Sequence, residues 1–297
     1  PISMRNSDDL TAGENPSYGA SLNYWLKEET EEDVEVKLII KNQAGETVRL
    51  LNGTKQAGIN RVWWDLRGER STEIKLRTKP MFADWLELND ERTRSHPAGR
   101  ISVLHPPSTY NVTLQVGEDE YTQNLEVVKD PHSAGTKEDI RLQTKMLFEL
   151  RENMNAVAGS VNQLEWVRRQ LGDMREVATA LGVDTEVMVE SAKELAGTFV
   201  TLEGKLLQLR ATGTGQDFAR WPAMLVGKLT YLANAVATAD FRPTDQHHQV
   251  HAKLKESLLE YQRELEGLLT NELPAFNHVL DENGLPRIIA GGESISP

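Results

Sequence analysis

The chain has 297 residues, of which 39% are apolar and 26% are charged, and it contains no cysteine. These proportions are typical of a folded globular protein and exclude disordered and collagen-like chains, while the lack of cysteine excludes disulfides, thiolate catalysis and cysteine-ligated metals. The net charge of −12 disfavours binding to a phosphate backbone, and no apolar run reaches the ~18–20 residues of a membrane-spanning helix. We therefore expect no nucleic-acid partner and no membrane span.

The first part of the chain, up to residue 130, reads as short β-strands separated by turns. Apolar and polar residues alternate along these segments, so each strand would bury one face. Gly, Asn and Asp residues between them are typical of antiparallel hairpins. The expected strands lie at 20–27, 34–40, 47–51, 61–66, 109–116 and 120–129. The pattern predicts an antiparallel β-sandwich.

A long segment without clear periodicity, residues 67–107, interrupts these strands. Loops above ~15 residues are uncommon unless they serve a function or are disordered. Met81, Phe82 and Trp85 form an apolar cluster in its middle. Because such clusters usually dock, we expect residues 81–88 to pack, as a short helix or turn, against the sandwich or a partner subunit.

The second part of the chain reads as helix and begins with one long element. Thr136 and Asp139 resemble a capping box. Two apolar stripes then repeat every seven residues, at Ile140, Leu147, Met154 and Val161, and at Leu150, Val157, Leu164 and Leu171. This spacing predicts a helix of about 35 residues with both stripes buried and Glu165 on a neighbouring, exposed face. Gly172 and Gly182 are expected stops, and Gly159 is the weakest point.

Three further main helices are expected at 184–209, 221–238 and 244–268, with a short one from Pro274 to Gly284. Four main helices predict an antiparallel bundle. The fold class is therefore α+β, with a β-sandwich domain at 1–130 that carries the loop 67–107, a four-helix bundle at 131–290 and a tail at 291–297. The start at Pro1, without Met or a signal segment, predicts a fragment, a processed product or a trimmed chain.

His247 and His251 are the most metal-like feature of the sequence. They are four residues apart, so they share one helix face as two zinc ligands would. No Glu follows His247, however, so the pattern is not an H-E-x-x-H motif. We expect no bound metal here and a solvated first helical turn instead, and we expect no cofactor.

Trp63, Trp64 and Asp65 are the candidate sugar site, because an aromatic platform beside a carboxylate suits carbohydrate binding. Strand alternation explains the Trp pair equally well, with one ring inward and one outward. Glycoside hydrolysis needs two carboxylates held across a cleft, and no such pair is patterned in the sequence. No catalytic residue is therefore assigned.

Several runs, taken in order, resemble the C-terminal region of large bacterial BNR-repeat, sortilin-type β-propeller proteins. The clearest are Gly58-Ile-Asn-Arg-Val-Trp-Trp-Asp-Leu-Arg67 and Glu272-Leu-Pro-Ala-Phe-Asn277. Further matching runs lie at 15–20, 24–27, 109–114, 121–123, 129–131, 161–164, 228–232, 243–246 and 284–286. One departure is Pro106-Pro-Ser108, where that family often has Pro-Gly.

The resemblance implies an exported bacterial protein in which an Ig-like module and a helical segment follow a propeller that is often labelled glycosyl-hydrolase or sialidase-like. The Ser-x-Asp-x-Gly-x-x-Trp boxes of that propeller are absent here, so its activity does not carry over to these residues. We expect a non-catalytic assembly or interaction region. Its candidate partners are the propeller of the same protein, another subunit and a second copy of the chain in a homo-oligomer. The alternative is a carbohydrate-binding or hydrolase accessory unit with its site at Trp63, Trp64 and the 67–107 loop.

Overall fold

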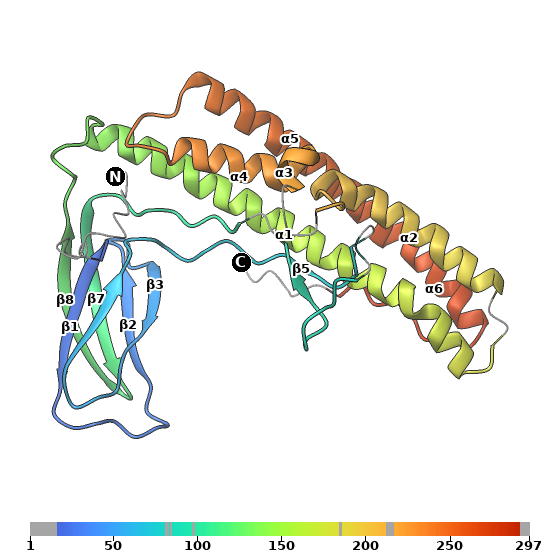
Figure 1. Cartoon of the computed structure of the whole chain (residues 1–297), viewed down its shortest axis with the longest axis horizontal. Helices are drawn as coiled ribbons and strands as arrows, with labels where there is room; N and C mark the ends of the chain where they lie inside the picture. The colour runs from blue at the N-terminus through green and yellow to red at the C-terminus, as the bar shows by residue number, and fades with distance from the viewer. Residues whose placement is uncertain are drawn as a thin grey trace, which may run out of the picture. The chain divides into compact units, whose positions relative to one another are not determined.

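The computed structural model describes residues 17–80, 83, 85–96, 99–183, 186–211 and 217–291. These residues form two compact units of an α+β chain (Figure 1). The strand unit comprises 17–69 and 104–128, and the helical unit comprises 70–103 and 129–291. Residues 70–103 therefore belong with the helices, whereas the sequence placed the whole segment 67–107 in the β-domain.

Two antiparallel sheets make up the strand unit. β1 (Ala20–Leu26) pairs with β4 (Gly58–Trp64). The second sheet has the order β3-β2-β7-β8. Its strands are β2 (Val36–Lys41), β3 (Thr47–Asn52), β7 (Ser108–Val116) and β8 (Asp119–Val127). All six predicted strands are confirmed to within a few residues, because the period-2 pattern that marks a half-buried strand is strong in each.

The inward faces of both sheets share one core. Trp64 of β4 meets Tyr110 of β7 edge-to-face, with ring centroids 5.2 Å apart. Leu22 of β1 packs in the same cluster as Leu38 and Ile40 of β2. Edge-to-face ring pairs add to the stabilisation from burial alone, so this contact helps to fix one sheet against the other.

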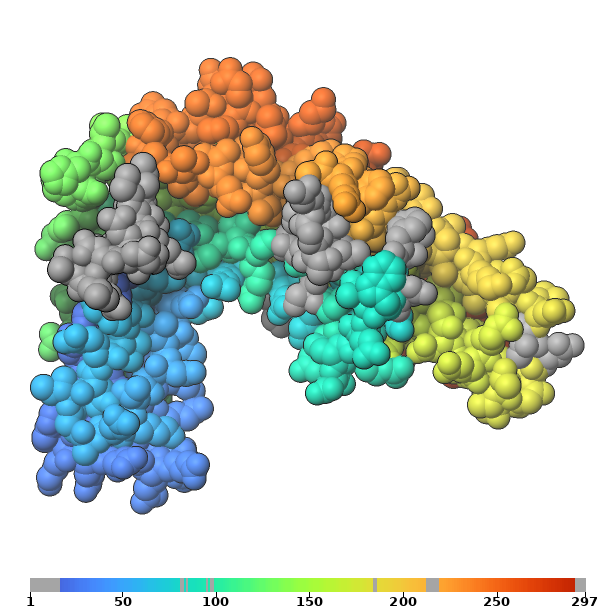
Figure 2. Space-filling view, in the orientation of Figure 1, coloured from blue at the N-terminus to red at the C-terminus, as the bar shows by residue number. Residues whose placement is uncertain are grey.

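The insert, residues 70–103, lies against α1 within the helical unit. It holds a two-residue ladder in which β5 (Lys75–Leu76) pairs with β6 (Arg94–Ser95). Figure 2 shows part of this segment, in teal, beside the yellow-green C-terminal half of α1. Of the apolar cluster expected to dock, Met81 and Phe82 lie outside the described residues. Ala83 is buried and starts a turn that Leu86 closes, but Trp85 is exposed. Docking of Trp85 on the strand unit or on a partner subunit stays a prediction.

α1 (Lys137–Ala180) has 44 residues and follows the predicted capping box of Thr136 and Asp139. At 1.5 Å per residue it is ~66 Å long. All eight residues of the two predicted stripes are buried. The helix continues through Gly159 and Gly172 and stops before Gly182, whose φ of +69° suits a residue without a side chain. It is longer than predicted because the stripe continues through Met174 and Ala178, which are also buried.

The remaining helices cover α1 in two columns (Figure 1). α2 (Glu186–Leu206) packs on its C-terminal half, where Arg168 binds Glu203, and α4 (Leu225–Val236) packs on its N-terminal half, where Gln143 donates to the Val236 carbonyl. The second column joins α5 (Asp245–Gly267), a π-helical turn at Leu268–Glu272 and α6 (Leu273–Glu282). A four-residue helix, α3 (Asp217–Arg220), precedes α4. Position 184, the expected start of the second helix, lies outside the described residues.

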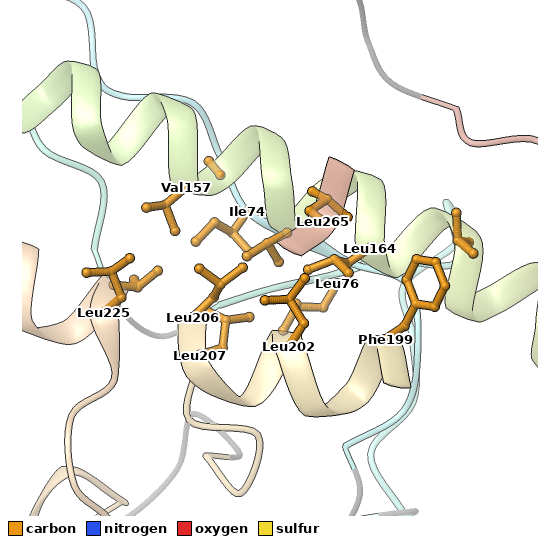
Figure 3. Close-up of a cluster of buried hydrophobic side chains, with 14 of the residues drawn as sticks. Ile74, Leu76, Val157, Leu164, Phe199, Leu202, Leu206, Leu207, Leu225 and Leu265 are labelled. Atoms are coloured by element: carbon orange, nitrogen blue, oxygen red, sulfur yellow. The ribbon is translucent and has the colours of Figure 1, made fainter. Parts of the chain in front are cut away.

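One continuous core runs through the helical unit. Figure 3 shows Val157 and Leu164 of α1 facing Leu202 and Leu206 of α2, with Leu225 of α4 at one end. Ile74 and Leu76 of the insert enter the same cluster. No helix within the described ranges has the length and apolar character needed to span a bilayer.

We expect Leu164→Ala to lower the free energy of unfolding by about 2–5 kcal/mol, because truncating a fully buried Leu removes its burial and leaves a cavity. The control is Leu259→Ala on α5, which makes the same chemical change at a side chain that is 45% exposed. Urea unfolding followed by circular dichroism measures both variants. Equal losses of stability would show that the buried stripe has been misplaced.

Candidate functional site

The candidate sugar residues do not lie on one surface. Trp64 is fully buried, and its indole N–H donates to the Arg67 carbonyl at 2.9 Å. Trp63 points to the other face of the sheet and is 39% exposed. The Asp65 carboxylate is exposed and accepts from the Arg67 backbone amide. Trp64 therefore cannot stack on a ligand, which corrects that part of the candidate site, and alternation along β4 is the physical reason.

The outer face of the β1–β4 sheet carries Trp63 with different neighbours. Trp63 lies opposite Ser21, and Ile59 lies opposite Trp25. Between these pairs the Arg61 Nε donates to the Asn23 Oδ1 at 2.9 Å. Trp25 is 64% exposed, so the face presents two separated indoles with a polar pair between them. Trp25 was not singled out from the sequence, although the same alternation that turns Trp63 outward turns Trp25 outward.

The two candidate metal-binding histidines make separate local contacts. His247 completes the capping box of α5: its Nδ1 accepts from the Thr244 amide, while its own amide donates to the Thr244 hydroxyl. His251 is buried, and its Nε2 lies 2.8 Å from the Asn153 amide nitrogen of α1. Among the residues that the structure describes, no three His, Asp or Glu side chains gather as a metal site would require.

Polar side chains of α1 hold the backbone of the insert. The Asn155 Oδ1 accepts from the Thr72 amide at 2.8 Å. About two turns further along α1, the Asn162 side chain accepts from the Lys75 amide at 2.7 Å and donates to the Glu73 carbonyl at 2.9 Å. Backbone groups that are taken out of water need such partners. The insert is therefore satisfied by helix side chains over much of its contact with α1.

Glu165 makes more hydrogen bonds to the insert than Asn155 or Asn162. Its carboxylate accepts from the backbone amides of Arg77 and Thr78 and from the Thr78 hydroxyl, the last at 2.8 Å. Arg168, one turn along α1, donates to Glu165 at 2.8 Å and also to Glu203 of α2. The Glu165–Arg168–Glu203 cluster thus joins the insert, α1 and α2. Glu165 was expected to be exposed, and that prediction is wrong because the insert covers its side of the helix.

The Glu165–Arg168–Glu203 cluster favours a neutral Glu203. Burial raises the pKa of the Glu203 carboxyl to about 8, repulsion from Glu165 adds to the effect, and attraction to Arg168 opposes it. The Glu203 Oε1 has no hydrogen-bond partner in the described part of the chain, which suits a protonated carboxyl better than a carboxylate. Nearby, burial lowers the pKa of the Arg94 guanidinium against the attraction of both glutamates.

Two carboxyl groups beside an arginine could in principle serve acid–base chemistry. Here Glu165 is 1% exposed and Glu203 is 0% exposed, so no substrate atom can reach them in this conformation. The four donors to Glu165 all come from the chain itself. We conclude that the cluster attaches the insert to the helices and does not act as an active site.

A signal for this cluster was present in the sequence. The first heptad stripe, continued seven residues beyond Val161, reaches Arg168, and the second, continued seven residues before Leu150, reaches Gln143. Both are polar residues at core positions. Gln143 donates to the carbonyls of Val236 and Ala239, and Arg168 binds the two glutamates.

Comparisons of the chain with protein-family models, with curated proteins and with solved structures find no match.

We expect Glu165→Ala to lower the free energy of unfolding by about 3–5 kcal/mol, because it removes one of the two buried carboxylates that bind Arg168 and leaves two backbone amides of the insert without a buried acceptor. Glu176→Ala, an exposed position further along α1, is the matched control and should change stability by less than about 0.5 kcal/mol. Chemical denaturation measures both. A Glu165→Ala variant as stable as the control would contradict the attachment.

The raised pKa of Glu203 predicts that its contribution to stability falls as the pH rises. The folded state keeps a proton that the unfolded state loses above the ordinary value of 4.5, so stability declines from about pH 4.5 up to the folded pKa of about 8. The slope from this one group is at most ~1.4 kcal/mol per pH unit. The difference between wild type and Glu203→Gln, measured across that range, isolates it. Glu194→Gln, an exposed change on α2, should leave the pH profile unaltered.

Proposed function

We propose that this chain is a non-catalytic assembly or interaction region that follows a BNR-repeat, sortilin-type β-propeller in an exported bacterial protein. One observation supports the non-catalytic part: four largely buried ionisable side chains of the helical unit bind other residues of the same unit. Glu165, Arg168 and Glu203 attach the insert to the helices, and His251 binds Asn153 inside the helical unit. The propeller itself enters the proposal only through the resemblance in sequence.

The proposal includes a finer description of the fold, namely an Ig-like sandwich followed by an antiparallel bundle of four main helices. The Tyr110 hydroxyl donates to the Pro106 carbonyl at 2.6 Å, just before β7. This contact resembles the tyrosine corner of Ig-like sandwiches. For the bundle, α1, α2, α4 and α5 support the description, with α2 and α4 taking successive lengths of α1.

The proposed partner is the propeller of the same protein or another subunit, and a homo-oligomer is included. The exposed side chains Trp25, Ile59 and Trp63 on one face of the β1–β4 sheet support an interaction role, since aromatic residues are enriched at protein interfaces. The net charge of −12 argues against a nucleic-acid partner.

A second candidate function, carbohydrate binding, is favoured by the same face. Trp25 and Trp63 are both exposed, and the Asn23–Arg61 pair between them offers polar groups to hydroxyls. The site would differ from the one expected at Trp63, Trp64 and the 67–107 loop, because Trp64 is buried and residues 70–103 belong to the helical unit.

We expect the chain to bind the separately produced region that precedes it in the parent gene, as measured by isothermal titration calorimetry. We expect no turnover of aryl-glycosides and no binding to a panel of oligosaccharides. Oligosaccharide binding that is lost in Trp25→Ala and Trp63→Ala, but kept in Tyr231→Ala on the helical unit, would favour the second candidate instead. An upstream region without propeller repeats would overturn the first.

A further inference from the structure

β8 is an edge strand of the strand unit with a long run of exposed side chains. β8 is nine residues long and pairs only with β7 among the described residues, at the end of the order β3-β2-β7-β8. Six successive side chains, 119–124, are exposed. It contains no Pro and no Lys, the residues with which natural proteins block such edges. A bare edge of this length is a template for another strand.

The opposite edge of the same sheet is covered. The Glu69 amide donates to the Val48 carbonyl of β3 at 3.2 Å, and the Glu69 carboxylate accepts from the Leu50 amide at 3.3 Å. Arg49 adds a bond to the Gly68 carbonyl. The chain thus blocks the β3 edge with its own backbone, whereas nothing in the described part of the strand unit does so for β8.

The negative charge of β8 indicates which kind of strand could pair with its edge. Glu120 and Glu126 lie on the outer face of the sheet, Glu118 lies in the turn before the strand, and Asp119 is the first residue of the strand. Lys129, the basic residue nearest to β8 in the sequence, donates to the carbonyls of Asp130 and Ser133. The outward residues of β7 beside it are uncharged. An added strand would therefore meet one sign of charge along this edge.

The inner face of β8 offers an apolar contact. Leu125 and Val127 pack against the shared core, but Tyr121 is 62% exposed. Its cross-strand neighbour Leu114 is half-buried. A further strand beside β8 would bring its inward side chains next to Tyr121 and so reduce the exposure of that ring.

We propose that the β8 edge binds an extended segment of a protein partner in which Lys or Arg on one face alternates with apolar residues on the other. The basic residues pair with Glu120 and Glu126, and the apolar residues cover Tyr121. Cross-strand pairs of opposite charge stabilise a sheet, while like charges directly opposite destabilise it. This rests on the proposed interaction function, for which it names the surface and the partner's chemistry.

A second copy of this chain fits the edge poorly. Antiparallel self-pairing centred on Gln123 would place Glu120 of each copy opposite Glu126 of the other, as the residue numbers require. The free edges of β1 and β4 are shorter, and neither strand contains an acidic residue. The charge argument therefore applies to β8 alone among these edges.

The test uses the full chain and a fluorescent nine-residue peptide that alternates Lys and Val. We expect binding by fluorescence anisotropy at low salt, with new amide-exchange protection confined to 119–127. The double variant Glu120→Lys, Glu126→Lys should weaken binding at least ~10-fold and should bind the matching Glu–Val peptide instead. The control Glu28→Lys, Glu29→Lys makes the same change of net charge in an exposed loop of the strand unit.

Each contrary result would overturn one part of the proposal for the β8 edge. Equal weakening by the control variant would show attraction to net charge alone, and unaltered binding of a peptide N-methylated at alternate residues would exclude strand pairing. Protection of 119–127 in the chain alone, rising with its concentration, would make the occupant a second copy. Circular dichroism confirms that each variant folds. If the upstream region binds wild type and the β8 double variant equally, the interaction function stands and the β8 assignment fails.

Discussion

The helical unit depends on the need to bury one apolar stripe along the whole of a 44-residue helix. A helix of that length exceeds what any single partner here can cover, since α2 has 21 residues and α4 has 12. The chain meets the demand by using α2 and α4 in succession and by extending α5 through a π-helical turn into α6. The insert closes a further side, which brings Ile74 and Leu76 into the same core. Residues of α2, α4, α5, α6 and the insert thus share one core with this stripe.

Covering a helix with an extended segment creates a second demand, because such a segment has unpaired backbone amides. The Asn155, Asn162 and Glu165 side chains meet it from α1. Burying Glu165 is costly unless the charge is paired, and Arg168 provides the pair. Arg168 in turn binds Glu203, whose raised pKa favours the neutral form and so limits the negative charge enclosed there. The buried polar groups therefore all follow from the packing of the insert on α1.

Much of the fold could be predicted from the sequence, because each correct element is specified by its own local pattern. Alternation located the strands, and the capping box of Thr136 and Asp139 located the start of α1. The insert was misassigned because its contacts join residues more than eighty positions apart, such as Thr72 with Asn155. Glu165 was misjudged for the same reason: a helical position is exposed or buried according to what packs on it. The burial of Trp64 could be predicted, because strand alternation turns one of the two neighbouring indoles inward.

The insert also constrains the order in which the chain can form its structure during synthesis. Residues 70–103 leave the ribosome before α1, so their backbone amides must stay bonded to water until Asn155, Asn162 and Glu165 have emerged. The strands on either side of the insert, β4 and β7, can pack together in the shared core before the insert has its partners on α1. A chain that began at residue 131 would lack part of the core of the helical unit. Four residues of that core precede this point in the sequence, namely Ile74, Leu76, Ile101 and Val103. In this chain the boundary between two folding units in space does not correspond to a boundary in the gene.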